Sequence, residues 1–267
     1  MTLIVGIKCR DGAVMAADSA ATISVALGPT TVCQKCTKLS AVGDLVIGTS
    51  GPVGLGQSFR DEIETVLKNH NDKCHWKTRL AAADGLRSAM WKHAKTEWEA
   101  AEVVSRTIGP QAAAQTAVST TLVALPIGDA AQLIQFDFKS SPEVASDDLP
   151  FVSIGSGQPL ADPFLAFMRK LLWPKDLPRL AHGIFYAVWA VSMAIEFAPV
   201  GLALPVQLFT LARKDGSWQA RQMDDRELGE HKEAISEVEA AFRTSWEKGI
   251  LECPEAVCPS PPSPGSK

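Results

Sequence analysis

The amino-acid sequence predicts an α+β fold, a four-layer αββα sandwich made of two stacked sheets with two helices over each. Apolar patterns along the chain follow the order strands, two helices, strands, two helices and strands, which is the order that such layers require. The length of 267 residues allows roughly three quarters of the unfolded surface to be buried, so the fold needs no disulfide or metal to hold it. No internal repeat interrupts the pattern.

The first half of the chain is expected to form two β-hairpins and then two helices. Asp11-Gly12 is a typical turn between two alternating apolar runs, and Val42-Gly43-Asp44 is the expected turn of the second hairpin. The first helix has apolar residues on one face, and the second is rich in alanine and tryptophan. The expected ranges are 2–9 with 13–18, 31–40 with 44–50, 54–70 and 78–106.

The second half is expected to supply the remaining layers of the sandwich. Its ranges are 119–125, 130–138 and 151–154 for strands, 161–173 and 179–197 for helices, and 206–213 with 218–223 for a closing hairpin. Residues 2–226 would then form one domain. We expect an added C-terminal helix over 227–250 and a Pro-rich, disordered tail over 251–267.

Charge and hydropathy exclude several classes of function. The net charge is −4 with acidic and basic residues interspersed, so the chain has no electrostatic footprint for nucleic acid or an anionic membrane. The apolar run at the N-terminus is short and carries Lys8 and Arg10, unlike a signal peptide. The most apolar later stretch, 184–198, is too short to span a membrane. We therefore expect a cytoplasmic protein.

Six cysteines in a chain without an export signal are expected to be reduced thiols. Cys33 and Cys36 have the two-residue gap of a zinc site, and Cys253 with Cys258 could complete a four-thiolate set. That second pair is four residues apart in a Pro-rich stretch, whereas a structural zinc needs fixed tetrahedral geometry. Ordinary buried thiols are the favoured interpretation, and neither a metal nor a cofactor is expected.

Thr2, directly behind Met1, is the first candidate for chemistry. Removal of Met1 would leave a residue that carries both a hydroxyl nucleophile and a free amine. An α-amine has a pKa of about 8, low enough for it to act as the base for its own hydroxyl. The alternative is that a small residue at this position suits translation and has no further role.

The residues after Thr2 carry a specific pattern. The stretch Ile4 to Gly12 ends in Asp-Gly and is followed by Ala16-Ala17-Asp18-Ser19. On these residues the chain resembles the proteasome β-subunit family of N-terminal nucleophile hydrolases, whose opening reads threonine, a strand, Asp-Gly and Ala-Ala-Asp-Ser. Similarity recurs at 48–54 and 153–157.

The resemblance spans roughly residues 2–212 and is greatest to the bacterial proteasome homologue group found in β-proteobacteria. The ancestral-type bacterial β-subunit and the peptidase of the HslUV machine look less similar. The resemblance implies the αββα sandwich of the N-terminal nucleophile hydrolases and a threonine-type endopeptidase. It also implies a homo-oligomeric ring that encloses the active sites.

The resemblance assigns the nucleophile and its neighbours. Thr2 would attack a peptide carbonyl and form an acyl-enzyme ester that water later hydrolyses. Lys35 matches the family lysine by its spacing before Leu39, and Asp18 would orient this lysine and tune its charge. Lys38 is the rival for the same role. In the expected register of the first hairpin Thr2 falls opposite Ala21, and a small bulge or slip would bring Ser19 or Asp18 beside it.

The remaining site residues are also assigned by resemblance. Gly51 matches the glycine whose backbone N–H faces the oxyanion, because a residue without Cβ lets a substrate come close. Ser156 matches the serine that hydrogen-bonds the N-terminal amine. Ala21 and Thr22 would flank the substrate cleft. For Gly51 and Ser156 the alternatives are an ordinary turn glycine and a turn that leads into a helix.

The chain departs from the family pattern near residue 196. The family usually carries Arg-Asp-Ala-x-Ser-Gly-Gly, whereas this chain reads Ile195-Glu196-Phe197-Ala198-Pro199-Val200-Gly201. Glu196 can stand in for the aspartate. Pro199 takes the place of the serine and cannot supply a hydroxyl, so the network around the amine has lost one member.

The partners expected from the resemblance are other copies of the chain in stacked rings, with two rings of seven preferred over rings of six. A peptide or unfolded protein would be the substrate, and a separate ATPase unfoldase, which the sequence does not identify, could serve the ring. Two alternatives stay open. One is a ring chamber or scaffold with a weak or inactive site, and the other is a small-amide hydrolase with the same nucleophile.

Overall fold

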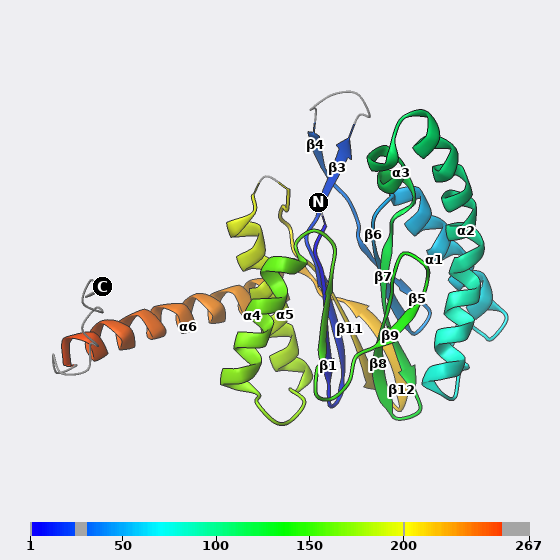
Figure 1. Ribbon diagram of the computed structural model, residues 1–267. Helices are drawn as coiled ribbons and strands as arrows, with labels where there is room; N and C mark the ends of the chain where they lie inside the picture. Colours follow the sequence, from blue (N-terminus) through cyan, green and yellow to red (C-terminus); the bar gives the residue numbers. More distant parts are fainter. Residues whose placement is uncertain (1, 25–30, 200, 253–267) are drawn as a thin grey trace, which may run out of the picture.

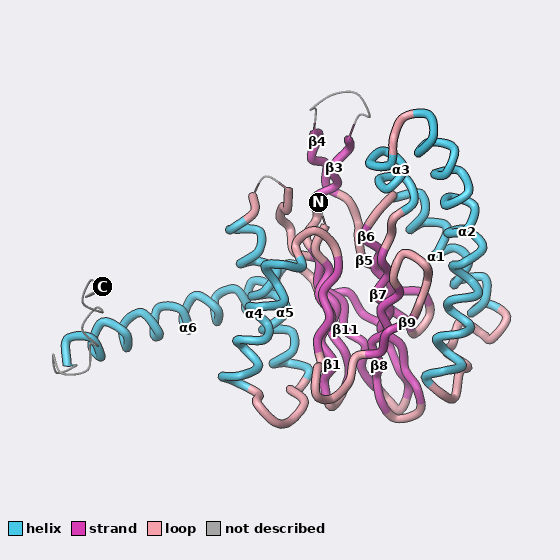
Figure 2. The backbone as a smooth tube through the Cα atoms, in the orientation of Figure 1, coloured by secondary structure: helices cyan, strands magenta, loops and turns pink. Residues whose placement is uncertain are grey.

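The structure is a computed structural model that describes residues 2–24, 31–199 and 201–252 (Figure 1). Two five-stranded antiparallel sheets lie face to face, and helices cover the outer face of each (Figure 2). The first sheet has the order β10 (Phe151–Ile154), β1 (Ile4–Cys9), β2 (Gly12–Ala17), β11 (Gln207–Lys214) and β12 (Ser217–Gln222). The second has the order β5 (Leu39–Val42), β6 (Leu45–Ser50), β7 (Thr120–Ile127), β8 (Ala130–Phe136) and β9 (Pro142–Val144).

The four layers are confirmed by how the helices pack. α4 (Gln158–Leu172) and α5 (Leu180–Phe197) cover the first sheet, and α1 (Val53–Lys68) and α2 (Arg79–Thr107) cover the second. Three large hydrophobic cores result in the described part of the chain, one between the sheets and one beneath each helix pair, and a small fourth cluster joins α2 to the short helix that follows it. The short helix α3 (Pro110–Ala117) and strand β9 were not expected from the sequence.

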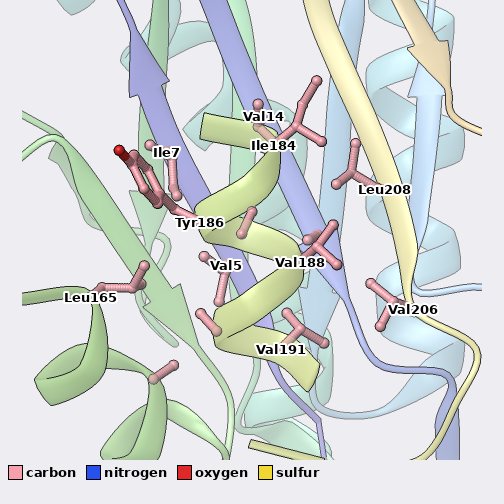
Figure 3. Packing of buried hydrophobic residues seen from close by; sticks show 14 of the residues in the cluster. Val5, Ile7, Val14, Leu165, Ile184, Tyr186, Val188, Val191, Val206 and Leu208 are labelled. Carbon is pink, nitrogen blue, oxygen red and sulfur yellow. The ribbon is translucent and has the colours of Figure 1, made fainter. Parts of the chain in front are cut away.

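Strand β1 runs through the centre of the sandwich, and its side chains alternate between two cores. Val5 and Ile7 point toward α5 and share a core with its residue Val188 (Figure 3). Ile4 faces the second sheet instead. All six residues of β1 are buried because both faces of this sheet are covered, which explains why the run is almost continuously apolar.

The register of the first hairpin differs from the expected one. Cys9 pairs with Gly12, so the turn consists of Arg10 and Asp11 rather than of Asp11-Gly12. A Cβ on Gly12 would lie 2.3 Å from the carbonyl oxygen of Leu211 on β11. Gly12 is therefore needed for the close approach of a neighbouring strand, and not for the turn.

The second expected hairpin is only partly correct. β5 pairs with β6 around Gly43 and Asp44, as predicted. Residues Thr31–Lys35 form β4, which pairs with the unexpected strand β3 (Ala20–Ser24) and not with β6. The β3–β4 ribbon stands at the same end of the molecule as the N-terminus (Figure 1). The ribbon lies between the strands of the two sheets in the sequence. Because it contains Lys35, it determines which lysine lies near Asp18.

α5 is the one helix of the described ranges that is long and apolar enough to cross a membrane. Its apolar residues Ile184, Val188 and Val191 pack on the first sheet (Figure 3). The core position of the helix thus accounts for its composition.

The added helix α6 (Asp225–Glu252) begins two residues before the expected position and projects from the layer of α4 and α5 (Figure 1). Leu228 and Ile235 join the core beneath α5, whereas residues 236–249 are all exposed. Residues 253–267, expected to form a tail, lie outside the described residues.

Candidate active site

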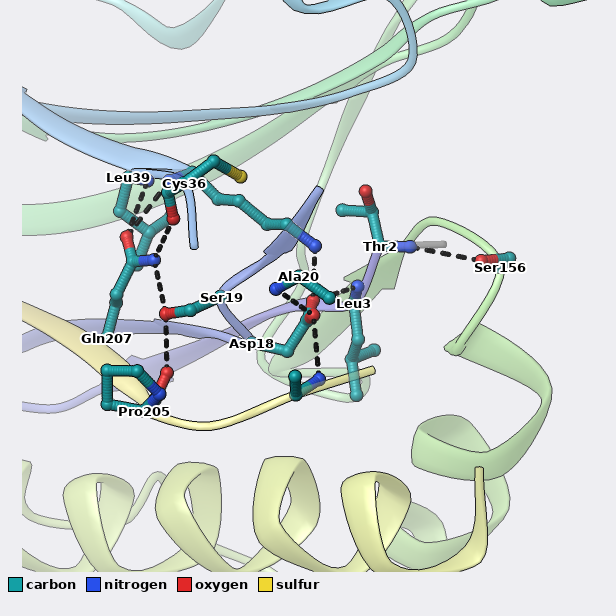
Figure 4. A network of polar contacts seen from close by, with 12 residues as sticks. Thr2, Leu3, Asp18, Ser19, Ala20, Cys36, Leu39, Ser156, Pro205 and Gln207 are labelled. Atoms are coloured by element: carbon teal, nitrogen blue, oxygen red, sulfur yellow. Dashed lines mark hydrogen bonds and ion pairs between the residues drawn. The ribbon is translucent and has the colours of Figure 1, made fainter. Parts of the chain in front are cut away.

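Thr2 is held by its backbone against the turn that precedes α4. Its N–H donates to Ser156 Oγ at 3.1 Å, and its carbonyl accepts from the N–H of Gly157 at 3.1 Å (Figure 4). The structure thus places Ser156 beside the Thr2 nitrogen, where the resemblance put it. Two hydrogen bonds fix Thr2, which lies two residues before β1, so its side chain starts from a defined position.

Two glycines allow this turn to approach so closely. Gly155 has φ +95°, and a Cβ there would lie 2.2 Å from the carbonyl oxygen of Thr2. A Cβ on Gly157 would lie 2.8 Å from Cβ of Leu3. Any side chain at either position would therefore push the N-terminal segment out of place.

Asp18 is fully buried and contacts Leu3, the residue that follows Thr2. Oδ1 accepts from the Leu3 N–H at 2.8 Å, and Oδ2 accepts from the Ala20 N–H at 2.9 Å and the Ala203 N–H at 3.4 Å. Backbone donors therefore compensate the buried carboxylate before any side chain is counted. Asp18 connects Leu3, beside the candidate nucleophile, to β3 and to the segment before β11.

The lysine that meets Asp18 is Lys38. Its Nζ lies 2.6 Å from Asp18 Oδ1, and the side chains of Lys38 and Asp18 are 5% and 0% exposed. Lys35, which was expected here, is exposed at the end of β4, where it pairs with Ala20. The pairing of Asp18 with Lys35 was wrong, because the β3–β4 ribbon ends at Lys35 and only the following segment turns back to Asp18.

A cleft of about 530 Å³ opens at this site. Thr2, Lys38, Gly51 and Ser156 all line it, so four of the candidate residues face one space. Ala21 also lines it, as expected, whereas the side chain of Thr22 lies outside the described residues. The rest of the lining is Ala20, Cys36, Thr37, Ser40, Ile47, Gly48, Thr49, Ser50, Pro52, Val53, Gly56, Gln57 and Arg60.

Gly51 has the backbone conformation that its expected role needs. Its φ is +128°, and a Cβ would lie 2.6 Å from the carbonyl oxygen of Val118. Among the described residues no hydrogen bond partner is found for its N–H. A donor at the wall of a cleft is able to serve an oxyanion.

The charged side chains that line the cleft are both cationic. Lys38 and Arg60 line it, and among the described residues no carboxylate does. Arg60 is hydrogen-bonded to the exposed carboxylate of Asp61, which lies outside the lining. Both cations are thus paired with carboxylates outside the lining, so the cleft presents cationic groups whose charge is largely compensated.

Glu196 is not brought to the site. It is exposed in the last turn of α5, and within the described residues no hydrogen bond or ion pair joins it to Thr2, Asp18 or Ser156. Pro199, two residues beyond the end of α5, is exposed as well. The part of the family network expected near residue 196 is therefore not assembled here.

Gln207, the first residue of β11, belongs to the network and was missed by the sequence analysis. Its carboxamide bonds Ser19, Cys36 and Lys38 at once (Figure 4). A single glutamine at a strand start carries no signal in the sequence, since its partners come from segments about 170 and 190 residues away.

The zinc alternative falls largely outside the described residues. This holds for Cys253, for Cys258 and for the side chain of Cys33. Cys36 lines the cleft and is not in a disulfide. Within the described ranges, no three residues of the metal-binding types lie together.

Comparison with known proteins gives concordant results. The family model described as "Proteasome subunit" matches residues 2–170. Anbu (ancestral beta-subunit) from Yersinia bercovieri is similar with a TM-score of 0.64 and 13% identity, over 94% of this chain and 98% of that chain. An Anbu (Gly-1) mutant from Hyphomicrobium sp. strain MC1 gives a TM-score of 0.63 and 16% identity, over 93% and 97%. A search of curated proteins found no match.

Identities this low establish the fold alone, so the bacterial subgroup stays an expectation. The family model, in contrast, covers more than half of the chain and includes Thr2, Asp18, Lys38, Gly51 and Ser156. The sandwich and its order of elements agree with it. The chain belongs to the proteasome subunit family and has the fold of its β-subunits.

Proposed function

We propose that the protein is a threonine-type peptidase of the N-terminal nucleophile class, with Thr2 as its nucleophile once Met1 has been removed. The observation that carries the proposal is the convergence of Thr2, Lys38 and Gly51 on one cleft, with Lys38 paired to the buried Asp18 behind it. A purely structural role for these residues would not require a threonine, a lysine and a backbone N–H donor to face one cleft.

The reaction proceeds in two steps. Thr2 Oγ1 attacks the peptide carbonyl carbon while the α-amine takes the hydroxyl proton, and the resulting oxyanion faces the N–H of Gly51. The C–N bond then breaks, and the α-amine gives its proton to the leaving amine. Water attacks the acyl ester in the same way, which releases a carboxylic acid and restores the Thr2 hydroxyl.

The neighbours of Thr2 have separate tasks in this scheme. Lys38, held by Asp18, places a cation beside the nucleophile and so favours the alkoxide that forms during attack. Ser156 Oγ accepts a hydrogen bond from the Thr2 nitrogen and would orient the free amine. Thr2 and Lys38 are the catalytic residues, whereas Asp18 and Ser156 position them.

The proposal includes a homo-oligomeric ring in the cytoplasm, two stacked heptamers, that degrades peptides or unfolded protein. Trp91 and Trp98 on α2 are 40% and 38% exposed, and tryptophan is favoured at protein interfaces. Enclosure of the sites would keep an unselective hydrolase away from folded proteins. Light scattering and negative-stain microscopy test the assembly, and a stable monomer at micromolar concentration would exclude it.

Intact mass and covalent labelling test the activity. The purified protein is expected to lack Met1 and to carry no acetyl group, and a peptidyl boronate or β-lactone should modify Thr2 alone. The Thr2→Ala variant is the control and should assemble normally without being labelled. Retention of Met1 in the native assembly would rule out the hydrolase, because the amine that activates the hydroxyl would not exist.

A chamber with an inactive site is the second candidate, favoured by Pro199 and by the exposed position of Glu196. It predicts rings of the same size that lose Met1 and still react with no electrophile. Peptide and small-amide substrates, offered to any protein that does react, separate the peptidase from a small-amide hydrolase.

A further inference from the structure

Gln207 connects three segments of the chain with a single carboxamide. Its Nε2 donates to Ser19 Oγ at 2.7 Å and to the carbonyl oxygen of Cys36 at 2.6 Å. Its Oε1 accepts from the N–H of Lys38 at 2.9 Å, and more weakly from the N–H of Leu39 at 3.5 Å. Both donors and the acceptor of the side chain are thus in use (Figure 4).

Two of these segments carry the two partners of the buried ion pair, and the third is the start of β11, where Gln207 itself lies. Ser19 follows Asp18, Lys38 itself is bonded at its backbone, and Gln207 starts a strand in which it pairs with Ala17. Ser19 is fixed further because its Oγ donates to the carbonyl oxygen of Pro205 at 2.5 Å. One amide therefore contacts residues on both sides of the Asp18–Lys38 contact, in addition to the hydrogen bond from the Cys36 N–H to the carbonyl oxygen of Ser19 at 2.9 Å.

Gln207 does not itself line the cleft. It contacts neither Thr2 nor the space where a substrate would lie. Any effect on the reaction must pass through the segment 36–39. β4 ends at Lys35 and β5 begins at Leu39, so residues 36–38 belong to neither strand. Lys38 lies in this segment, which could adopt more conformations without the hydrogen bonds from Gln207.

We propose that Gln207 is a positioning residue that fixes the backbone of Lys38 and thereby keeps its ammonium group on Asp18 beside Thr2. The effect of Gln207 on the reaction rate rests on the proposed function, whereas its effect on the backbone of residues 36–39 does not. Without the carboxamide the segment 36–39 samples more conformations, and Lys38 spends less time at Asp18. Residues 36–38 also line the cleft, so substrate binding weakens as well, by less than the reaction slows.

Two substitutions separate the contributions of the carboxamide. Gln207→Leu removes all of its hydrogen bonds, whereas Gln207→Glu keeps an acceptor for the Lys38 N–H and loses both donors. Gln219→Leu on the exposed face of β12 is the matched control. Thermal unfolding of each variant shows that it is folded, and the nearly isosteric Gln207→Glu keeps the test open if Gln207→Leu does not fold.

The first readout does not depend on activity. Amide hydrogen exchange, followed by mass spectrometry in the Thr2→Ala background, should accelerate in the peptide that covers 36–39 for Gln207→Leu, with exchange in α1 unchanged. Gln219→Leu should leave both peptides unaltered. Unchanged exchange over 36–39 in both Gln207 variants would overturn the inference, whatever the enzyme does.

The second readout is the rate at which Thr2 reacts. Loss of these hydrogen bonds should slow boronate labelling and lower kcat by about tenfold to a hundredfold in Gln207→Leu, and by less in Gln207→Glu, with a smaller change in KM than in kcat. In a Lys38→Ala background the Gln207→Leu change should lower the residual rate no further. Additive losses, or rates equal to that of the Gln219 control, would show that Gln207 does not act through Lys38.

The two readouts distinguish failure of this inference from failure of the proposed function. Faster exchange over 36–39 in a protein that never reacts with an electrophile would refute the hydrolase and leave the structural role of Gln207 standing. A protein that reacts with electrophiles, and whose Gln207 variants show normal exchange and normal rates, would refute the role of Gln207 and leave the hydrolase standing.

Discussion

Lys38 Nζ lies 2.6 Å from Asp18 Oδ1, and this ion pair is almost completely buried beneath the segment that begins with Thr2. Leu3, the neighbour of Thr2, donates its N–H to the same carboxylate oxygen. A buried charge pair is costly unless its hydrogen bonds are complete, and the backbone donors around Asp18 help to complete them.

The first prediction concerns which lysine serves Thr2. Lys38→Ala should reduce the rate of Thr2 labelling by about 10²- to 10⁴-fold, because it removes the cation beside the nucleophile. Lys35→Ala is the matched control and should label at nearly the normal rate, since Lys35 is exposed at the end of β4. Labelling by β-lactone, followed by mass spectrometry over time, measures both rates. Equal losses would mean that the ion pair at Asp18 has no part in activating Thr2.

The second prediction concerns the turn that holds Thr2. Gly155→Ala would place a Cβ 2.2 Å from the carbonyl oxygen of Thr2, so the N-terminal segment must move. We expect a free energy of unfolding lower by about 3 kcal/mol or more, together with loss of labelling. Gly128→Ala is the control, because Gly128 also has a positive φ but nothing lies within 4 Å of its Cβ.

Comparison of the two glycine variants isolates the clash from the backbone strain. Gly128→Ala should cost only the strain of a left-handed alanine, about 1–2 kcal/mol, and should label normally. Urea unfolding monitored by tryptophan fluorescence gives both values. Similar losses for Gly155→Ala and Gly128→Ala would indicate that the turn adapts to a Cβ and is not needed to hold Thr2.

Much of the fold could be predicted because the apolar periodicity is strong. The order of the layers, the strand Phe151–Ile154 and the two helix pairs follow from local patterns. The register of the first hairpin could not be predicted, since Gly12 looks like a turn residue while its real neighbour is the backbone of Leu211 on β11. Long-range contact, invisible in the local sequence, decided that position.

Part of the site could be predicted because its residues lie in local patterns. Thr2, Asp18, Gly51 and Ser156 lie in short motifs, and the structure brings them together. The lysine lies after the β3–β4 ribbon, whose length determines which lysine returns to Asp18. The spacing of the motif could not show where that ribbon ends.

The third prediction separates the two halves of α6. Ile235 is 6% exposed and packs beneath α5, whereas Phe242 is 67% exposed. Ile235→Ala should lower the free energy of unfolding by about 2–4 kcal/mol, and Phe242→Ala should change it by no more than about 0.5 kcal/mol. Urea unfolding measures both. A comparable loss in Phe242→Ala would mean that another chain covers the outer half of the helix.

The last prediction concerns acid. Burial lowers the pKa of His231 on α6, and the nearby Glu230 and Glu227 raise it by less. In the unfolded chain the imidazole would take up a proton near its ordinary pKa of about 6.5. The unfolded state therefore binds more protons than the folded one in this range, so the free energy of unfolding falls as the pH drops from about 7.5 to about 5.5. His231→Gln should make this decline shallower, because glutamine does not titrate. Urea unfolding of both proteins at the two pH values measures the difference. An equally steep decline in the variant would show that other groups are responsible for the acid sensitivity.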